Sequence, residues 1–260
     1  MNIAKNTAKT LISVVIPFYN EEENIADLAH EVVQVMETAY PNQWELLLVN
    51  DGSADETGRI AGKLAQQVPN IRALHLVPNS GQSAALAAGF RACKGRYVAT
   101  LDGDGQNDPA DIPKALELLK AKRADMVCGI RAKRADTWLR KVSSKVANAV
   151  RNKILKDGAK DTGCSLKIFK REKIVNAPLF RNSHRYYPAL IQMQGGKMAQ
   201  MSVNHRPRAH GVSKYGKGIK SRLFVGIYDL VGVYWLRKRA FRYQVIESQQ
   251  TATATPLKKP

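Results

Sequence analysis

A short acidic run near the middle of the chain holds the residues with the clearest chemistry. Asp102, Asp104 and Gln106 alternate with Gly103 and Gly105. Alternating positions on an extended segment present their side-chain oxygens to one side, and glycines allow a ligand to approach the backbone closely. Hard divalent cations prefer such oxygens and often share them with substrate phosphates. The run therefore predicts a divalent-cation site that handles phosphate groups.

Two familiar motifs do not account for this run. In an EF-hand, a bidentate Glu would stand at position twelve counted from Asp102, where the chain has Pro113. A dinucleotide site would need G-x-G-x-x-G after the first apolar run, which instead ends in PFYNEEEN. A P-loop is also absent from the sequence.

Two more polar clusters follow apolar runs. The first contains Pro17, Tyr19 and Glu21, and the second runs through residues 50–53 and contains Asp51. Each cluster alone is typical of a turn. In open α/β sheets, however, ligands bind outside the carboxyl ends of the strands. Three such clusters at one sheet edge predict a ligand site.

The elements that must position these clusters alternate along the first half of the chain. Continuous apolar runs bounded by turn residues predict buried strands, and apolar spacing of three and four predicts helices. The alternation favours an α/β fold with a mostly parallel sheet flanked by helices. Asn20 and Glu23 have the spacing of a capping box for the first helix. The expected strands are 11–17, 44–50, 71–77, 96–101 and 125–130, and the expected helices are 25–36, 55–67, 81–93 and 113–122.

Beyond residue 131 this rhythm changes. We expect a basic helix at 138–155 and another helix at 184–194, with extended segments at 166–170 and 197–203. The basic helix is either a solvated face or a surface for a membrane or an acceptor.

Composition narrows the partners. The chain has 260 residues, 44% of them hydrophobic, which excludes fibrous and mostly disordered classes. Its 41 Lys and Arg against 22 Asp and Glu give a formal charge of +19, which favours polyanions: nucleic acid, anionic lipid or phosphorylated small molecules. Three scattered cysteines form no disulfide framework and favour a reducing, cytoplasmic setting. We expect no membrane-spanning segment, because apolar runs are too short.

Seven motifs together resemble a known family. IPFYNEEENI, VNDGSADET, NSGQSAALAAGF and LDGDGQNDPADIP, in this order, are similar to family 2 glycosyltransferases of the GT-A fold. The later DTGCSLKIFKRE, HRYYPALIQMQGG and HRPRAHGVSKYG resemble the polyprenyl-phosphate, or dolichol-phosphate mannosyltransferase-like, members. The resemblance covers residues 11–215 and implies a nucleotide-binding GT-A sheet.

The resemblance also implies roles on the donor side. The nucleoside of a sugar nucleotide would contact Pro17, Tyr19, Glu21 and Asp51. A Mg²⁺ or Mn²⁺ ion on the diphosphate would be bound by Asp104 with Gln106, and by Asp102, which would also lie near the ribose and diphosphate.

Further residues are implied on the acceptor side. Asp161 would lie in an acceptor loop, and Arg131 joins Asp104 and Asp161 as a catalytic candidate. The residues implied to bind phosphate groups of donor and acceptor are Arg131, Arg206, Arg208, Ser213 and Lys214.

Two positions depart from the family pattern. Asn50 replaces the first Asp of the usual DDGS, and Gly105 stands where a larger residue is usual. The change at Asn50 leaves open whether the donor nucleotide is UDP or GDP. The change at Gly105 leaves the implied metal ligands in place.

The implied reaction is metal-dependent, inverting transfer of a sugar from a nucleotide sugar to a polyprenyl phosphate at the cytoplasmic membrane face. The acceptor phosphate is already anionic, so it needs positioning by cations more than it needs a general base. A soluble or glycan acceptor is the alternative. A basic nucleic-acid-binding protein is a third hypothesis, but acidic clusters at the ligand edge would repel phosphate without a metal, so we expect no nucleic-acid partner.

The chain divides into three expected parts: a catalytic domain at 1–215, an amphipathic membrane-interface segment at 216–243 and a disordered tail at 244–260. Apolar residues from Leu223 to Trp235 recur near helical spacing and are followed by the cations Arg237, Lys238 and Arg239. Such helices lie in membrane interfaces, which predicts peripheral binding to the inner face of the cytoplasmic membrane. The alternative is docking on the protein's own core or on a second subunit of a homo-oligomer.

Overall fold

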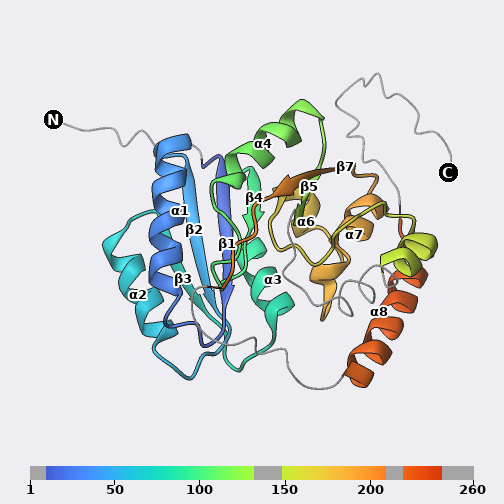
Figure 1. The fold of residues 1–260 in the computed structure, drawn as a ribbon, viewed down its shortest axis with the longest axis horizontal. Helices are drawn as coiled ribbons and strands as arrows, with labels where there is room; N and C mark the ends of the chain where they lie inside the picture. The colour runs from blue at the N-terminus through green and yellow to red at the C-terminus, as the bar shows by residue number, and fades with distance from the viewer. Residues whose placement is uncertain (1–9, 132–147, 209–218, 242–260) are drawn as a thin grey trace, which may run out of the picture.

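One seven-stranded sheet forms the centre of the protein (Figure 1). The computed structural model describes residues 10–131, 148–208 and 219–241, and the side chains of the last segment from residue 224. The strand order is β3-β2-β1-β4-β6-β5-β7. The first four strands are parallel to one another, as the sequence predicted.

Strands β1 and β2 explain why that prediction was possible. β1 (Ile12–Phe18) and β2 (Trp44–Asn50) are buried along their whole length. A strand covered on both faces needs an unbroken apolar run, which is the pattern that the sequence shows. The flanking parallel strands are β3 (Ile71–His75) and β4 (Tyr97–Thr100).

Helices cover both faces of the sheet. One face packs against α1 (Ile25–Ala39), α2 (Thr57–Gln67) and α4 (Asp111–Ala121). The other face packs against α3 (Gln82–Ala92). The confirmed prediction is therefore a mixed α/β sheet, mostly parallel, between two helical layers.

Close packing of α3 on β1 depends on a glycine. A Cβ atom at Gly89 would lie 2.3 Å from Cγ1 of Val15, so any other residue would push the helix away from the sheet. This approach sets the position of the first residues of α3, which lie at the ligand edge.

The strand at residues 166–170 is present but runs against its neighbours. β6 (Lys167–Lys170) lies between β4 and β5 (Met126–Arg131) and is antiparallel to both. β7 (Met198–Val203) pairs in parallel with β5 and is the last strand in the order.

The remaining helices lie in the second half of the chain. Residues 148–155 are helical, and the rest of the basic helix expected at 138–155 lies outside the described residues. The helix expected at 184–194 is divided into the short 3₁₀ turn η1 (Ser183–Arg185) and α7 (Tyr187–Met193). Pro188 lies in the first turn of α7, where its missing N–H costs nothing. The last two elements to be placed are α6 (Arg171–Val175) and α8 (Ile219–Arg239).

The predicted capping box is wrong. Asn20 has a left-handed backbone (φ 52°), and α1 begins only at Ile25. The Asn20 side chain instead accepts a hydrogen bond from the backbone N–H of Ala54 at 2.8 Å. Asn20 thus connects the loops that follow β1 and β2, a contact between segments far apart in sequence.

Candidate active site

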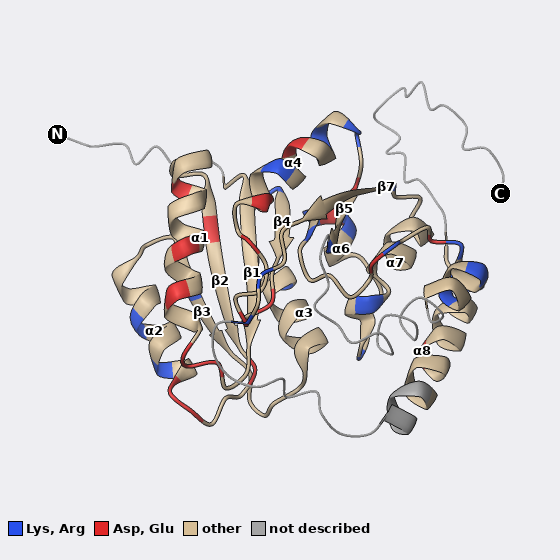
Figure 2. Cartoon of the chain, viewed as in Figure 1, with Lys and Arg blue, Asp and Glu red and all other residues tan. Residues whose placement is uncertain are grey.

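Three polar loops meet where β1, β2 and β4 end. These strands are parallel neighbours, so their carboxyl ends share one edge of the sheet. Figure 2 shows acidic residues on the loops at this end, which we call the carboxyl edge. A late segment joins them: the N–H of Arg206 donates to the carbonyl of Gln106 at 2.8 Å. The clusters that the sequence predicted to converge do converge.

Arg208 links two of the predicted acidic residues. Its Nη2 lies 3.0 Å from Oδ2 of Asp104, and its Nη1 lies 3.3 Å from Oε1 of Glu21. Arg208 and Glu21 also line a hollow of about 250 Å³ at this edge, together with residues 20, 22–24 and 55. The guanidinium of Arg208 therefore neutralises carboxylates from two loops that are far from it in sequence.

Asp102 is half-buried beside Asp104. Burial and then the charge of Asp104 raise its pKa to about 6, while Ser165, Lys167 and Arg131 act to lower it. Its Oδ1 accepts a hydrogen bond from Nε2 of Gln82 at 2.7 Å. Negative charge at this position is thus costly and would be relieved by a cation.

The carboxylates at this edge fit a divalent cation that is bound partly by substrate phosphates, such as Mg²⁺. Within the described residues, no group of three His, Cys, Asp or Glu side chains is placed to hold a metal ion. Mg²⁺ and similar ions need only one or two carboxylates when substrate phosphates and water complete their coordination. Asp102 and Asp104 match that requirement. Gln106 lies close by, with its N–H donating to Oδ1 of Asp104 at 3.2 Å.

Asp51 is occupied by the loop that precedes α3. Its carboxylate accepts hydrogen bonds from the N–H groups of Ser80 and Gly81, both at 2.9 Å, and from Nδ2 of Asn79 at 3.0 Å. Its predicted contact with a nucleoside stays a prediction. The loop contacts give Asp51 a positioning role that the sequence did not indicate.

The other predicted nucleoside contacts lie along the same edge. Pro17 is buried near the end of β1, and Tyr19 is 41% exposed just after it. Asn50, which departs from the family pattern, accepts from the N–H of Ser53 at 3.0 Å and lies 3.2 Å from Nδ1 of His75.

Arg131 and Asp161 form a two-pronged ion pair. Nε of Arg131 lies 2.8 Å from Oδ2 of Asp161, and Nη2 lies 2.9 Å from Oδ1. The pair joins the end of β5 to the loop before β6. The sequence predicted both residues as parts of the site but did not predict that they are paired.

Arg206 contacts two carboxylates outside the metal run. Its guanidinium lies 2.8 Å from Glu31 of α1 and 2.8 Å from Asp108. Its predicted binding of phosphate stays a prediction. Ser213 and Lys214, predicted to bind phosphate as well, lie outside the described residues.

The cysteines are buried thiols. All three are free, as expected from their spacing. Burial raises the pKa of Cys128 to about 12 and also raises the pKa of Cys164, although Lys167 acts to lower both. Cys164, two residues beyond Thr162 in the loop of Asp161, is therefore protonated at neutral pH and is a poor nucleophile.

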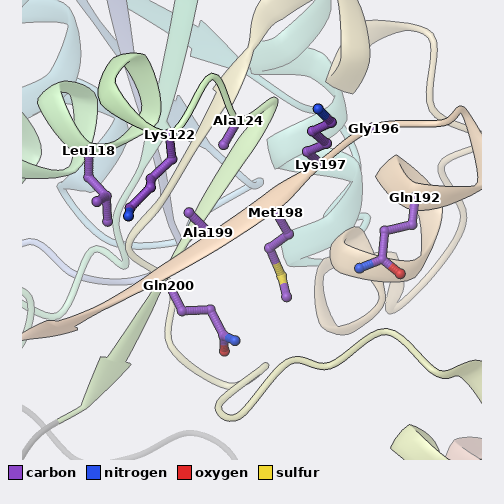
Figure 3. A pocket seen from close by; sticks show the side chains of 9 residues that line it. All are labelled: Leu118, Lys122, Ala124, Gln192, Gly196, Lys197, Met198, Ala199 and Gln200. Atoms are coloured by element: carbon purple, nitrogen blue, oxygen red, sulfur yellow. The ribbon is translucent and has the colours of Figure 1, made fainter.

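A larger hollow lies away from this chemistry. It measures about 590 Å³ and opens beside β7 (Figure 3). Its lining includes the ends of α4 and α7 but none of the predicted site residues. The residues that line it are Leu118, Lys122, Ala124, Gln192, Gly196, Lys197, Met198, Ala199 and Gln200.

The mostly parallel sheet between two helical layers is the fold of a GT-A glycosyltransferase. The family model for glycosyl transferase family 2 matches residues 13–176. The chain belongs to this family and is a glycosyltransferase.

Two relatives of known name are similar to most of this chain. The chain is 39% identical over 234 residues to a dodecaprenyl-phosphate galacturonate synthase of Rhizobium johnstonii, covering 88% of this chain and 68% of that protein. It is 36% identical over 227 residues to an undecaprenyl-phosphate 4-deoxy-4-formamido-L-arabinose transferase of Aeromonas hydrophila, covering 87% and 68%. The chain thus spans about two thirds of the length of these relatives.

A solved structure supports the fold. Glucosyl-3-phosphoglycerate synthase from Mycobacterium tuberculosis, in complex with Mn²⁺, UDP and glucosyl-3-phosphoglycerate, aligns with a TM-score of 0.61. The alignment covers 89% of this chain and 81% of that one at 18% identity.

Proposed function

We propose that this glycosyltransferase moves a sugar from a nucleotide-sugar donor to a polyprenyl phosphate. The observation that carries the proposal is the meeting of Asp102 and Asp104 with Arg208 at the carboxyl edge. Such an edge can hold a diphosphate through a metal on one side and through a guanidinium on the other. The two relatives, both named for polyprenyl-phosphate substrates, support the choice of acceptor.

On the donor side, Asp104, Asp102 and Gln106 would hold Mg²⁺ or Mn²⁺. When bound, the ion supplies positive charge that stabilises the nucleoside diphosphate as it leaves. Arg208 can move from Asp104 to the diphosphate, because both are anionic partners for a guanidinium. Pro17, Tyr19, Glu21 and Asp51 would surround the nucleoside, either uridine or guanosine.

On the acceptor side, the phosphate oxygen attacks the anomeric carbon as the bond to the diphosphate breaks. A single displacement of this kind inverts the anomeric centre. The acceptor oxygen is already anionic, so correct placement matters more than deprotonation. Asp161 holds the guanidinium of Arg131 by two hydrogen bonds. Arg131, fixed in this way, would help to place the acceptor phosphate. Arg206, Ser213 and Lys214 would add further phosphate contacts.

The lipid acceptor calls for a membrane-facing surface, and α8 offers one. Phe224, Ile227, Tyr228, Val231 and Trp235 are exposed along this helix. Its last turn carries Arg237, Lys238 and Arg239. Aromatic and aliphatic residues combined with cations favour an anionic bilayer surface. Among the described residues, no helix has the length and hydropathy needed to span a bilayer. We place α8, within the segment 216–243, at the inner face of the cytoplasmic membrane and residues 1–215 in the catalytic domain.

A transfer assay tests the proposal. Purified protein is incubated with Mg²⁺ or Mn²⁺, a polyprenyl phosphate and a mixture of UDP- and GDP-sugars, and the lipids are analysed by mass spectrometry. We expect a lipid that has gained one sugar, and loss of this product in Asp104→Ala by roughly 100-fold or more. Asp27→Ala, which removes an exposed carboxylate from α1, is the control and should retain activity.

Two outcomes would contradict it in different ways. Nucleotide release that depends on Asp104, without a new lipid, would indicate a soluble or glycan acceptor. Equal products from Asp104→Ala and the wild type would exclude the assigned donor site.

A further inference from the structure

A buried cation lies beneath the loop that carries Asp161. We call residues 157–164 the acceptor loop. The side chain of Arg151 is 8% exposed and that of Asp157 is 0% exposed, and Nε of Arg151 lies 3.1 Å from Oδ2 of Asp157. Arg151 belongs to the helical segment 148–155, whose basic residues the sequence indicated as a surface for solvent, membrane or acceptor. The guanidinium of Arg151, however, faces the interior of the protein and not its surface.

Arg151 contacts the acceptor loop at three separate points. Besides Asp157, its Nη2 donates to the carbonyl of Ala159 at 2.6 Å, and its Nη1 donates to Oγ1 of Thr162 at 2.7 Å. Nη1 also donates to Oδ1 of Asn148 at 2.6 Å. The planar guanidinium therefore fixes both the start and the end of the loop to one helix.

A second buried cation holds the same end of the loop. Lys167 of β6 is 3% exposed, and its Nζ donates to the carbonyl oxygens of Thr162, at 3.4 Å, and Cys164. Thr162 is thus held through its hydroxyl by Arg151 and through its carbonyl by Lys167. It is the immediate neighbour of Asp161.

The position of Arg131 depends on this loop path. Asp161 binds the guanidinium of Arg131 from one side, and the N–H of Gly163 donates to Oδ1 of Asp161 at 3.1 Å. A Cβ atom at Gly163 would lie 2.8 Å from Nη2 of Arg131, so the backbone and guanidinium are in close contact. A small displacement of residues 161–163 would therefore move the guanidinium.

Stability alone is a poor reason for this arrangement. A buried ion pair pays a desolvation cost that can exceed its Coulomb attraction, and well-packed apolar residues often serve stability better. What the pair provides here is directional hydrogen bonding to several loop atoms. We propose that Arg151 is a positioning residue for transfer: it fixes the acceptor loop so that Asp161 holds Arg131 in place for the acceptor phosphate. This inference rests on the proposed function.

Arg151→Lys is the informative substitution, because it keeps the charge but loses the fork that reaches Ala159 and Thr162. We expect kcat with a polyprenyl phosphate to fall by roughly 10- to 100-fold, the scale of a small misplacement of a positioned group. Donor affinity, measured by calorimetry with UDP- or GDP-sugar and Mn²⁺, should stay within about twofold of the wild-type value. The substitution removes contacts of Arg151 to the acceptor loop, away from Asp102 and Asp104. Lys170→Gln is the control: it breaks the Lys170–Asp125 ion pair (2.7 Å), which lies opposite Tyr97 at the amino end of β4.

Coupling to Asp161 separates positioning from general damage. If Arg151 acts through Asp161, then Arg151→Lys should cost at most about twofold in an Asp161→Asn background, because the loss is not additive along one path. Equal losses in both backgrounds would overturn the proposal. Wild-type kcat in a folded Arg151→Lys variant would overturn it as well.

Hydrogen exchange gives a readout independent of transfer. The backbone amides of residues 158–163 should exchange at least about tenfold faster in Arg151→Lys than in the wild type, whereas those of β1 should not change. Unchanged exchange in the loop overturns the inference even if the wild type lacks the proposed activity. If Arg151→Lys does not fold, the double variant Arg151→Met/Asp157→Leu removes both charges, and the same exchange criterion applies to it.

Discussion

At the carboxyl edge, the guanidinium of Arg208 contacts two carboxylates. Arg208 lies between Glu21 and Asp104, and all three side chains are mostly buried. A divalent cation that binds Asp104 must compete with this arginine. Donor phosphates would relieve the competition, because they offer Arg208 another anionic partner.

We therefore predict that Arg208→Met binds Mn²⁺ more tightly in the absence of nucleotide. Removing the competing cation should lower the Kd for Mn²⁺ by roughly 3- to 10-fold, while sugar transfer should fall because the diphosphate loses a partner. Titration followed by electron paramagnetic resonance measures the free Mn²⁺. Arg206→Met is the matched control, since Arg206 pairs with Glu31 and Asp108 instead. Equal or weaker Mn²⁺ binding by Arg208→Met would contradict this competition.

Residue types in the carboxyl edge were predictable, but their partners were not. The alternation of Asp102, Asp104 and Gln106 indicated a cation site before any fold was known. The Arg208–Glu21 contact joins residues 187 positions apart, and local spacing has no information on such a pair. Arg151 illustrates the same limit, because an arginine in a basic helix looks alike whether it faces solvent or a buried carboxylate.

At the scale of elements, the first turn of α3 connects the carboxyl edge to the second half of the chain. Gln82 donates to Asp102, and the next residue, Ser83, has its Oγ 2.8 Å from Nδ1 of His184 in η1. Burial, with smaller effects of Arg185 and Lys167, lowers the pKa of His184 to about 3. The imidazole is therefore neutral in the folded protein throughout the physiological range.

This neutral histidine predicts a loss of stability in mild acid. Below about pH 6.5 the unfolded chain binds a proton at His184 that the folded protein does not bind, so the free energy of unfolding falls as pH falls. Between pH 7.5 and 5.5 the contribution of His184 to this loss should be about 1.4 kcal/mol. Urea denaturation of the wild type and His184→Gln at both pH values measures it. The variant keeps a hydrogen-bonding group near Ser83 but cannot be protonated, so its loss should be smaller by that amount; equal losses would show that His184 is not buried as a neutral group.

Strands were easier to predict than their directions. The continuous apolar runs of β1 and β2 required burial on both faces, and both are buried. β6 has four residues, and nothing in its pattern shows that it lies antiparallel between β4 and β5. The acceptor loop leads into β6, and Arg151 and Lys167 hold this loop by hydrogen bonds to hydroxyl and carbonyl groups that an apolar pattern does not reveal.

At the scale of the whole molecule, α8 has two unlike faces. Leu230, Val233 and Leu236 pack against the core beside α7, and Nδ2 of Asn182 lies 3.1 Å from Oδ2 of Asp229. These contacts anchor the helix to the core that covers one face of the sheet. Tyr228 and Trp235, seven residues apart, point away from the core and are 80% and 61% exposed. Docking on the protein's own core thus accounts for one face and leaves the aromatic face for a partner.

The aromatic face and the positive charge of the chain should act together on a membrane. Burying two aromatic side chains is worth about 1.5–3 kcal/mol each, so Tyr228→Glu/Trp235→Glu should weaken binding to anionic vesicles by roughly 100-fold or more. Lys63→Gln/Lys122→Gln is the matched control, because both double variants lower the formal charge of +19 by two. Sedimentation with phosphatidylglycerol vesicles measures the bound fraction.

The salt dependence of vesicle binding separates the electrostatic contribution from the apolar one. The electrostatic part should fall at 0.5 M NaCl, a concentration at which the Debye length is roughly 4 Å, whereas the apolar part should persist. We therefore expect the wild type and the lysine variant to keep partial binding in high salt, and the glutamate variant to keep none. Equal binding by both double variants at low salt, with complete release of the wild type at high salt, would mean that charge alone attracts the protein to the bilayer and that the exposed face of α8 binds another surface.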